Sequence, residues 1–165
     1  TLKLDPRVKT SPAGLAQLAS LSREMYDGAQ AANTAYTQAR VLSAALGKLQ
    51  GTDVDAFRKE VDALAPAAPA GGRGRGFGFG FGRGGRGGSA PATLQTLSNT
   101  LLGAAMAMQG ADVAPTAVEI TACNQARAET HDVMARRNTL KTSGLAAFNA
   151  KRKAAGQPQV KLPND

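Results

Sequence analysis

The longest regular pattern in the chain is an apolar stripe between residues 11 and 50. Small or apolar residues recur at alternating steps of three and four: Leu18, Leu21, Met25, Gly28, Ala32, Ala35, Ala39, Leu42, Leu46 and Leu49. This spacing is the a/d seam of a helix that packs lengthwise against partners, as in a coiled coil. Ser11 and Pro12 predict its start, because serine is a good N-cap and proline suits the first helical position. The stripe therefore predicts one long helix whose small central residues let a partner backbone approach closely.

Two shorter helices with the same three-four spacing are predicted next. The first covers residues 53–65 and carries Val54, Phe57, Val61 and Leu64 on one face. Pro66 and Pro69 are expected to end it, because proline cannot continue a helix. The second ends near Gly110 and carries Leu94, Leu97, Leu101, Ala104 and Met108. Both patterns indicate amphipathic helices that bury one face.

A second long helix is predicted from Pro115 to about Thr142. Its seam is less regular and consists of Cys123, Ala126, Thr130, Val133, Arg137 and Leu140. Ser143 and Gly144 are expected to break it, and a short terminal helix over 145–155 is expected to follow. The link before Pro115 is so short that the helices on either side of it should be antiparallel neighbours.

The helix lengths predict the architecture. The two short helices together have about thirty residues, or roughly 45 Å at about 1.5 Å per residue, which matches either long helix. We therefore expect an all-α, antiparallel up-down-up bundle with an interrupted middle helix. Residues 11–156 would form this bundle, with a low-complexity insertion over 65–91. Residues 1–10 read as the end of a preceding β domain or a linker, and 157–165 as a tail.

The insertion contains the most unusual stretch, GGRGRGFGFGFGRGGRGG at residues 71–88. Eleven of its eighteen residues are glycine, so we expect a disordered loop, because glycine-rich chain loses much entropy on ordering. Its arginines can pair with phosphates and its phenylalanines can stack on bases. The candidate polyanion-binding residues are Arg73, Arg75, Phe77, Phe79, Phe81, Arg83 and Arg86. A tolerated surface insertion is the alternative reading.

Composition changes this picture little. The formal net charge of +8 and a pI near 10.2 favour acidic partners. Cys123, the single cysteine, is expected to be a buried small hydrophobe, and His131 a solvated histidine from which the neighbouring Asp132 points away. Arg40 and the carboxylate Asp62 are expected on solvated faces. No run reaches the roughly 18 apolar residues that a membrane span needs.

Several segments resemble a known family. LDPRVKT (4–10), LSREMYDG (21–28), LLGAAMAMQGADVAPTAVEI (101–120) and GLAAFNAKRKAAGQP (144–158) are similar to the C-terminal helical region of bacterial BNR-repeat, sortilin-like β-propeller proteins, often labelled glycosyl hydrolases. The resemblance implies an exported parent protein with a propeller domain preceding this region. Any glycan-handling site would lie in that propeller, and no catalytic residue of the family maps onto this chain.

The sequence thus predicts a non-catalytic helical accessory or interaction domain at the C-terminus of an exported β-propeller protein. No catalytic, metal or cofactor site is predicted. Two alternatives stay open: weak binding of RNA or another polyanion through residues 71–88, and homo-oligomerisation through the long helix.

Overall fold

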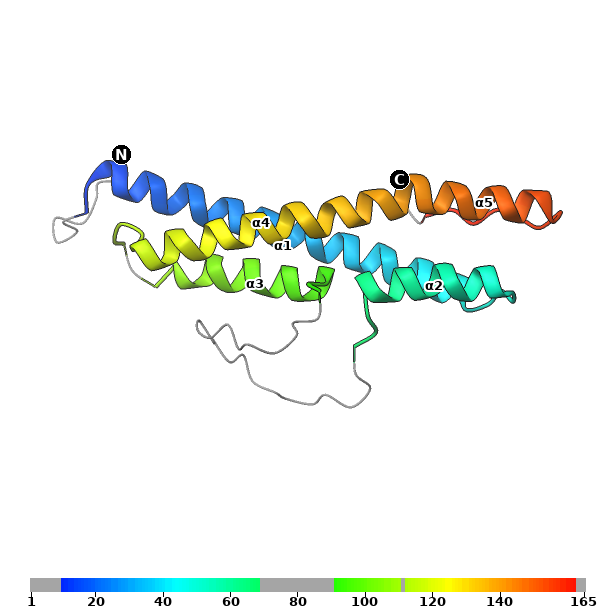
Figure 1. Cartoon of the computed structure of the whole chain (residues 1–165). Helices are drawn as coiled ribbons and strands as arrows, with labels where there is room; N and C mark the ends of the chain where they lie inside the picture. The colour runs from blue at the N-terminus through cyan, green and yellow to red at the C-terminus, as the bar shows by residue number, and fades with distance from the viewer. Residues whose placement is uncertain (1–9, 69–90, 111, 163–165) are drawn as a thin grey trace, which may run out of the picture.

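The computed structural model describes residues 10–68, 91–110 and 112–162 of the 165-residue chain. Every regular element in these ranges is helical, which confirms the all-α prediction. In chain order the elements are α1 (Pro12–Leu46), α2 (Thr52–Leu64), α3 (Leu94–Ala107), α4 (Ala117–Thr139), the π-helical η1 (Leu140–Gly144) and α5 (Leu145–Ala154). Figure 1 shows their arrangement.

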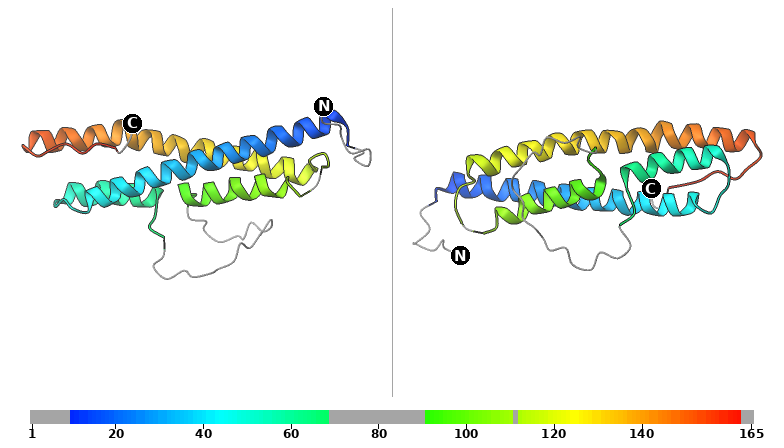
Figure 2. Two further views of the ribbon diagram at one scale, coloured as in Figure 1. Left: turned by 180° about the vertical axis from the view of Figure 1, so that it is seen from behind. Right: turned by 60° about the horizontal axis from the view of Figure 1, so that its bottom comes forward.

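The helices form three columns of similar length. α1 is the first column, and α2 and α3 lie end to end along it as the second (Figure 1). α4, η1 and α5 follow one another as a nearly continuous third column, in which α4 packs on α3 and α1 and α5 packs on α2 (Figure 2). The up-down-up bundle with an interrupted middle helix is therefore confirmed.

The seam of α1 is buried as its spacing predicted, with one shift. The core positions on this helix are Leu21, Met25, Ala29, Ala32, Ala35, Ala39, Leu42 and Leu46. Ala29 takes the place predicted for Gly28, which is half-buried. A Cβ atom on Gly28 would lie 3.3 Å from Leu101 Cδ1, so the absence of a side chain there does let α3 approach closely.

Polar caps define where the helices begin. The Oγ of Ser11 accepts a hydrogen bond from the backbone N–H of Gly14, as the N-cap prediction requires. Thr93 caps α3 in a reciprocal box with Thr96. Thr116 caps α4 in the same way with Glu119, whose carboxylate accepts from the Thr116 backbone N–H at 2.7 Å.

The third column continues through the predicted break at Ser143 and Gly144, so that prediction is wrong. The buried residues of α4 are Cys123, Ala126 and Val133. If the buried face of α4 continued past η1 with the same alternating steps of three and four residues, its next positions would be 144, 147 and 151. The buried residues of α5 are instead Leu145, Phe148 and Arg152, each one position later. η1 takes up this extra residue, because a π turn bonds i to i+5 and so changes the phase of a helix without ending it.

An aromatic pair joins α2 to α5 in the core. Phe57 of α2 and Phe148 of α5 stack with ring centroids 4.8 Å apart and planes inclined by 15°. A Cβ atom on Gly144 would lie 3.4 Å from the Phe57 ring, so η1 also packs against α2. Across the described ranges, no helix is both long and apolar enough to cross a membrane.

Candidate functional site

The predicted polyanion-binding residues, Arg73 to Arg86, lie outside the described residues, as do residues 1–9. What the structure does describe is the point where the insertion leaves the bundle and the point where it returns. We call residues 65–68 and 91–93 the stem. The stem lies between α2 and α3, beside the middle of α1 (Figure 1).

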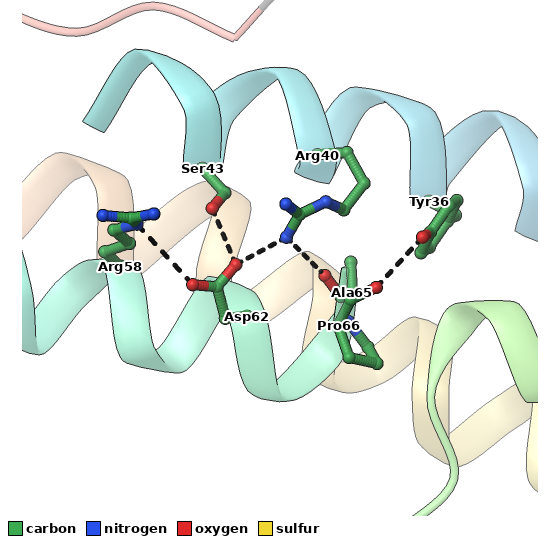
Figure 3. A network of polar contacts seen from close by, with 7 residues as sticks. All are labelled: Tyr36, Arg40, Ser43, Arg58, Asp62, Ala65 and Pro66. Carbon is green, nitrogen blue, oxygen red and sulfur yellow. Dashed lines mark hydrogen bonds and ion pairs between the residues drawn. The ribbon is translucent and has the colours of Figure 1, made fainter. Parts of the chain in front are cut away.

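The entry side of the stem is held by a polar network on Asp62 (Figure 3). One carboxylate oxygen, Oδ1, accepts a hydrogen bond from Arg40 Nη1 and another from Ser43 Oγ, both at 2.6 Å. The other oxygen lies 3.6 Å from Nε of Arg58, one turn earlier on α2. Ser43 is completely buried, so its hydroxyl depends on this carboxylate for a partner.

Two carbonyl groups at the end of α2 are also fixed. Pro66 ends the helix because the residue before a proline avoids the α-helical region, and Ala65 accordingly adopts φ −134° and ψ 74°. Arg40 Nη1 donates to the Ala65 carbonyl at 3.0 Å, and the Tyr36 hydroxyl donates to the Pro66 carbonyl at 2.9 Å (Figure 3). Side chains from α1 therefore hold the chain as it enters the insertion.

The exit side of the stem is held by α4 and by α3 itself. Arg136 Nη1 donates to the Ala92 carbonyl at 2.8 Å. The next residue, Thr93, caps α3, so the chain becomes helical immediately afterwards. Ser98 then donates to the Ala29 carbonyl at 3.0 Å and links the start of α3 to α1. Both ends of the insertion are thus attached to a different helix from the one that they continue.

Two further polar contacts join α4 to α1. Arg127 forms a two-point pair with Glu24, with Nε–Oε1 and Nη2–Oε2 distances of 2.6 Å. This hydrogen bond lowers the pKa of Glu24 and raises that of Arg127. Arg137 donates to Gln38 Oε1 at 2.7 Å.

The two residues with reactive side chains are placed largely as predicted. Cys123 is buried, and burial raises the pKa of its thiol. The His131 side chain is 86% exposed. Its Nδ1 lies 3.4 Å from Asp132 Oδ1, so the expectation that Asp132 points away is wrong. Among the described residues, no group of three His, Cys, Asp or Glu side chains could hold a metal ion.

The side chains that hold the stem are not predicted by the sequence pattern. That pattern places Arg40 and Asp62 on solvated faces, whereas their side chains are only 29% and 37% exposed and bind each other. One feature of the sequence did indicate that Ser43 is buried. Ser43 directly follows the seam residue Leu42, and the buried face of a helix is wider than the seam alone. Its partner Asp62 is 19 residues away, and local spacing does not reveal such a pair.

No family model, no curated protein and no solved structure matches this chain.

Proposed function

We propose that this chain is a non-catalytic helical scaffold that presents residues 71–88 from a fixed stem, and that those residues bind a polyanion. One observation carries the proposal. Charged and hydroxyl side chains of α1 and α4 bind backbone carbonyls on both sides of residues 71–88, at Ala65 and Pro66 and again at Ala92. An insertion without a function would not require side chains of neighbouring helices to hold the backbone where it begins and where it ends.

The chemistry of the presented residues supports a polyanionic partner. Four arginines and three phenylalanines stand among glycines in residues 71–88. Arginine pairs with phosphate or sulfate groups, phenylalanine stacks on bases, and glycine offers no steric obstacle to a ligand. RNA, single-stranded DNA and sulfated polysaccharide share the repeated negative charge that this composition suits.

A binding titration with matched charge variants tests the proposal. The probe is a fluorescently labelled single-stranded RNA, with a heparin oligosaccharide in a parallel arm, and the receptor is the full chain. In the test variant, Arg73, Arg75, Arg83 and Arg86 are replaced by Gln. If all four arginines contact phosphates, log K against log salt should fall with a slope of about −3. The test variant should lose at least about tenfold in affinity and most of this slope.

The control variant removes the same charge elsewhere. Lys48, Lys59, Lys151 and Lys153 are exposed side chains on the bundle, and their replacement by Gln changes the net charge equally. The proposal predicts that this variant binds nearly as well as the unmodified chain. Equal losses in the two variants would show that net charge alone drives binding, and the assignment to residues 71–88 would fail.

The association of two copies through α1 is a less favoured alternative. The seam residues Ala32, Ala35 and Ala39 are already buried by the chain's own helices. A second copy would have to displace those helices. Analytical ultracentrifugation tests this alternative, and a mass that stays monomeric over a wide concentration range would remove it.

The parent context is also a proposal, and it rests on the sequence resemblance alone. We propose that the scaffold follows propeller repeats in an exported protein. Sequencing the gene upstream of the codon for Thr1 tests this directly. Propeller repeats there would support the context, and an unrelated upstream region would remove it.

A further inference from the structure

Exposed apolar side chains gather at the end of the bundle where α1 begins. Five large hydrophobic side chains are exposed in the part of the chain that the structure describes, and three of them belong to residues 106–118. These three are Met106 of α3, Val113 of the connection between α3 and α4, and Val118 of α4. Exposed apolar residues that lie together mark an interaction surface, whereas scattered ones need no explanation. We call Met106, Val113 and Val118 the end patch.

The chain enters the bundle directly beside the end patch. The start of α1 and the connection between α3 and α4 lie at the same end of the molecule (Figures 1 and 2). Thr10 Oγ1 donates to the Asp112 carbonyl at 2.6 Å. A Cβ atom on Gly14 would lie 2.9 Å from Ala114 Cβ and 3.1 Å from Thr10 Cγ2. Asp112 and Ala114, the two chain neighbours of Val113, are therefore both packed beside the entry point at Thr10.

The residues that precede Thr10 alternate strictly between apolar and charged side chains. The even positions hold Leu2, Leu4, Pro6 and Val8, and the odd positions hold Lys3, Asp5, Arg7 and Lys9. This period of two predicts an extended segment with all of its apolar side chains on one face. An apolar face of this kind is stable only against another apolar surface. Since every regular element of the described ranges is a helix, they contain no strand that could pair with this segment.

We propose that residues 2–8 dock on the end patch as an extended segment, with their apolar face against Met106, Val113 and Val118. The charged face then points to solvent, and the apolar end of the bundle is closed by the chain itself. This inference does not depend on the proposed function. Its occupant is chosen by the place where Thr10 is attached and by the alternating pattern that precedes it.

The reach of the segment agrees with this placement. Residue 8 lies within about 7 Å of Thr10, because two residues span no more than that. The whole of residues 2–9 reaches roughly 27 Å, which is enough to cross two neighbouring helices whose axes lie about 8–10 Å apart. Attachment at Thr10 also gives the segment an effective concentration in the millimolar range, which favours it over a second copy of the chain.

Methyl NMR of the unmodified chain with a soluble paramagnetic compound tests whether the end patch is covered. The compound broadens the signals of methyl groups that solvent reaches. The exposed fractions of Val113 and Val118 are 53% and 70% without the segment, and that of Val41 is 47%. Val41 is the internal control, because it lies roughly 40 Å along α1 from Pro12. Docking predicts clearly less broadening at Val113 and Val118 than at Val41, and broadening that is equal or greater there would overturn the proposal.

Two variants of the full chain, matched in charge, identify what covers the patch. The docking variant carries Leu2→Asp, Leu4→Asp and Val8→Asp. It should lower the ratio of docked to undocked segment at least about tenfold, since one apolar side chain returned to water accounts for that factor. The control carries Lys3→Gln, Arg7→Gln and Lys9→Gln, which changes the net charge equally. Val113 and Val118 should lose their protection in the docking variant and keep it in the control.

The other outcomes overturn the proposal. Equal losses in the two variants would show that charge, and not the apolar face, holds the segment. Protection that persists in the docking variant would assign the cover to other groups, and its dependence on protein concentration would identify a second copy. If the docking variant loses the helical circular dichroism of the parent, nuclear Overhauser contacts in the unmodified chain decide. Docking predicts such contacts between residues 2–8 and the end patch, and their absence would overturn it.

Discussion

Replacing Asp62 by alanine removes the centre of the network that fixes the entry side of the stem. Ser43, at zero exposure, would keep a buried hydroxyl without its acceptor, which costs about 1–3 kcal/mol. The lost ion pair with Arg40 adds at most about 1 kcal/mol, because both side chains are about a third exposed and solvent screens them. Alanine returns about 0.5 kcal/mol of helix propensity. We expect a net loss of about 0.5–3.5 kcal/mol in the free energy of unfolding.

Urea and thermal unfolding followed by far-UV circular dichroism measure this loss. For a chain of this length, the expected shift in Tm is about 1–14 °C. A double-mutant cycle with Ser43→Ala isolates the buried contact and should give a coupling energy of about 1 kcal/mol. The control is Glu60→Ala, at an exposed position of the same helix, which should change stability by less than about 0.5 kcal/mol. An Asp62→Ala variant as stable as this control would refute the reasoning.

Two further predictions concern the third column. The Glu24–Arg127 pair should contribute about 0.2–1 kcal/mol above pH 4.5, the ordinary pKa of Glu24, because the pKa in the folded state is lower. The stability difference between the parent and Glu24→Gln should therefore be constant near neutral pH and shrink as the pH falls below 4.5; a difference that grows there would contradict the pairing. Deletion of Thr142 removes the extra residue of η1 and should change the unfolding free energy by less than about 1 kcal/mol, because α4 and α5 keep their buried faces. Deletion of Ala128 instead rotates Val133 by about 100° away from the core. It should lower the free energy of unfolding, measured in urea, by about 1.5–3 kcal/mol. Equal effects of the two deletions would contradict the interpretation that η1 takes up one extra residue.

The columns of the bundle were predictable because their signals are local. The α1 seam repeats over many turns, so the shift from Gly28 to Ala29 did not change the predicted face. The starts at Ser11 and at Thr116 depend on contacts within three residues. Helix lengths then limited the ways in which the columns could pair.

The break predicted at Ser143 and Gly144 failed for a physical reason. Both residues disfavour a regular α-helix, and they lie where the helix is in fact irregular. A helix can respond to such a point by ending or by widening one turn. Packing of η1 on Phe57 and of α5 on α2 stabilises the continued helix. The residues that provide this packing lie more than eighty positions away in the sequence.

The contacts that hold the stem, and those between α5 and residues 157–162, were not predictable from spacing. Arg136 binds a carbonyl 44 residues away, and Arg40 binds a carboxylate 22 residues away. Backbone carbonyls carry no sequence signature, so an arginine that binds one looks like any solvated arginine. The sequence of residues 157–162 predicts a tail and gives no indication of their contact with Asn149.

The most direct test of the scaffold proposal separates folding from binding in one variant. The four arginines and three phenylalanines of residues 71–88 are replaced by serine, so the length of the insertion and both ends of the stem are kept. Unfolding in urea and binding of labelled single-stranded RNA are then measured on the same preparation. We predict an unfolding free energy within about 0.5 kcal/mol of the parent and a loss of RNA affinity of at least about tenfold. RNA binding equal to that of the parent would contradict the proposal.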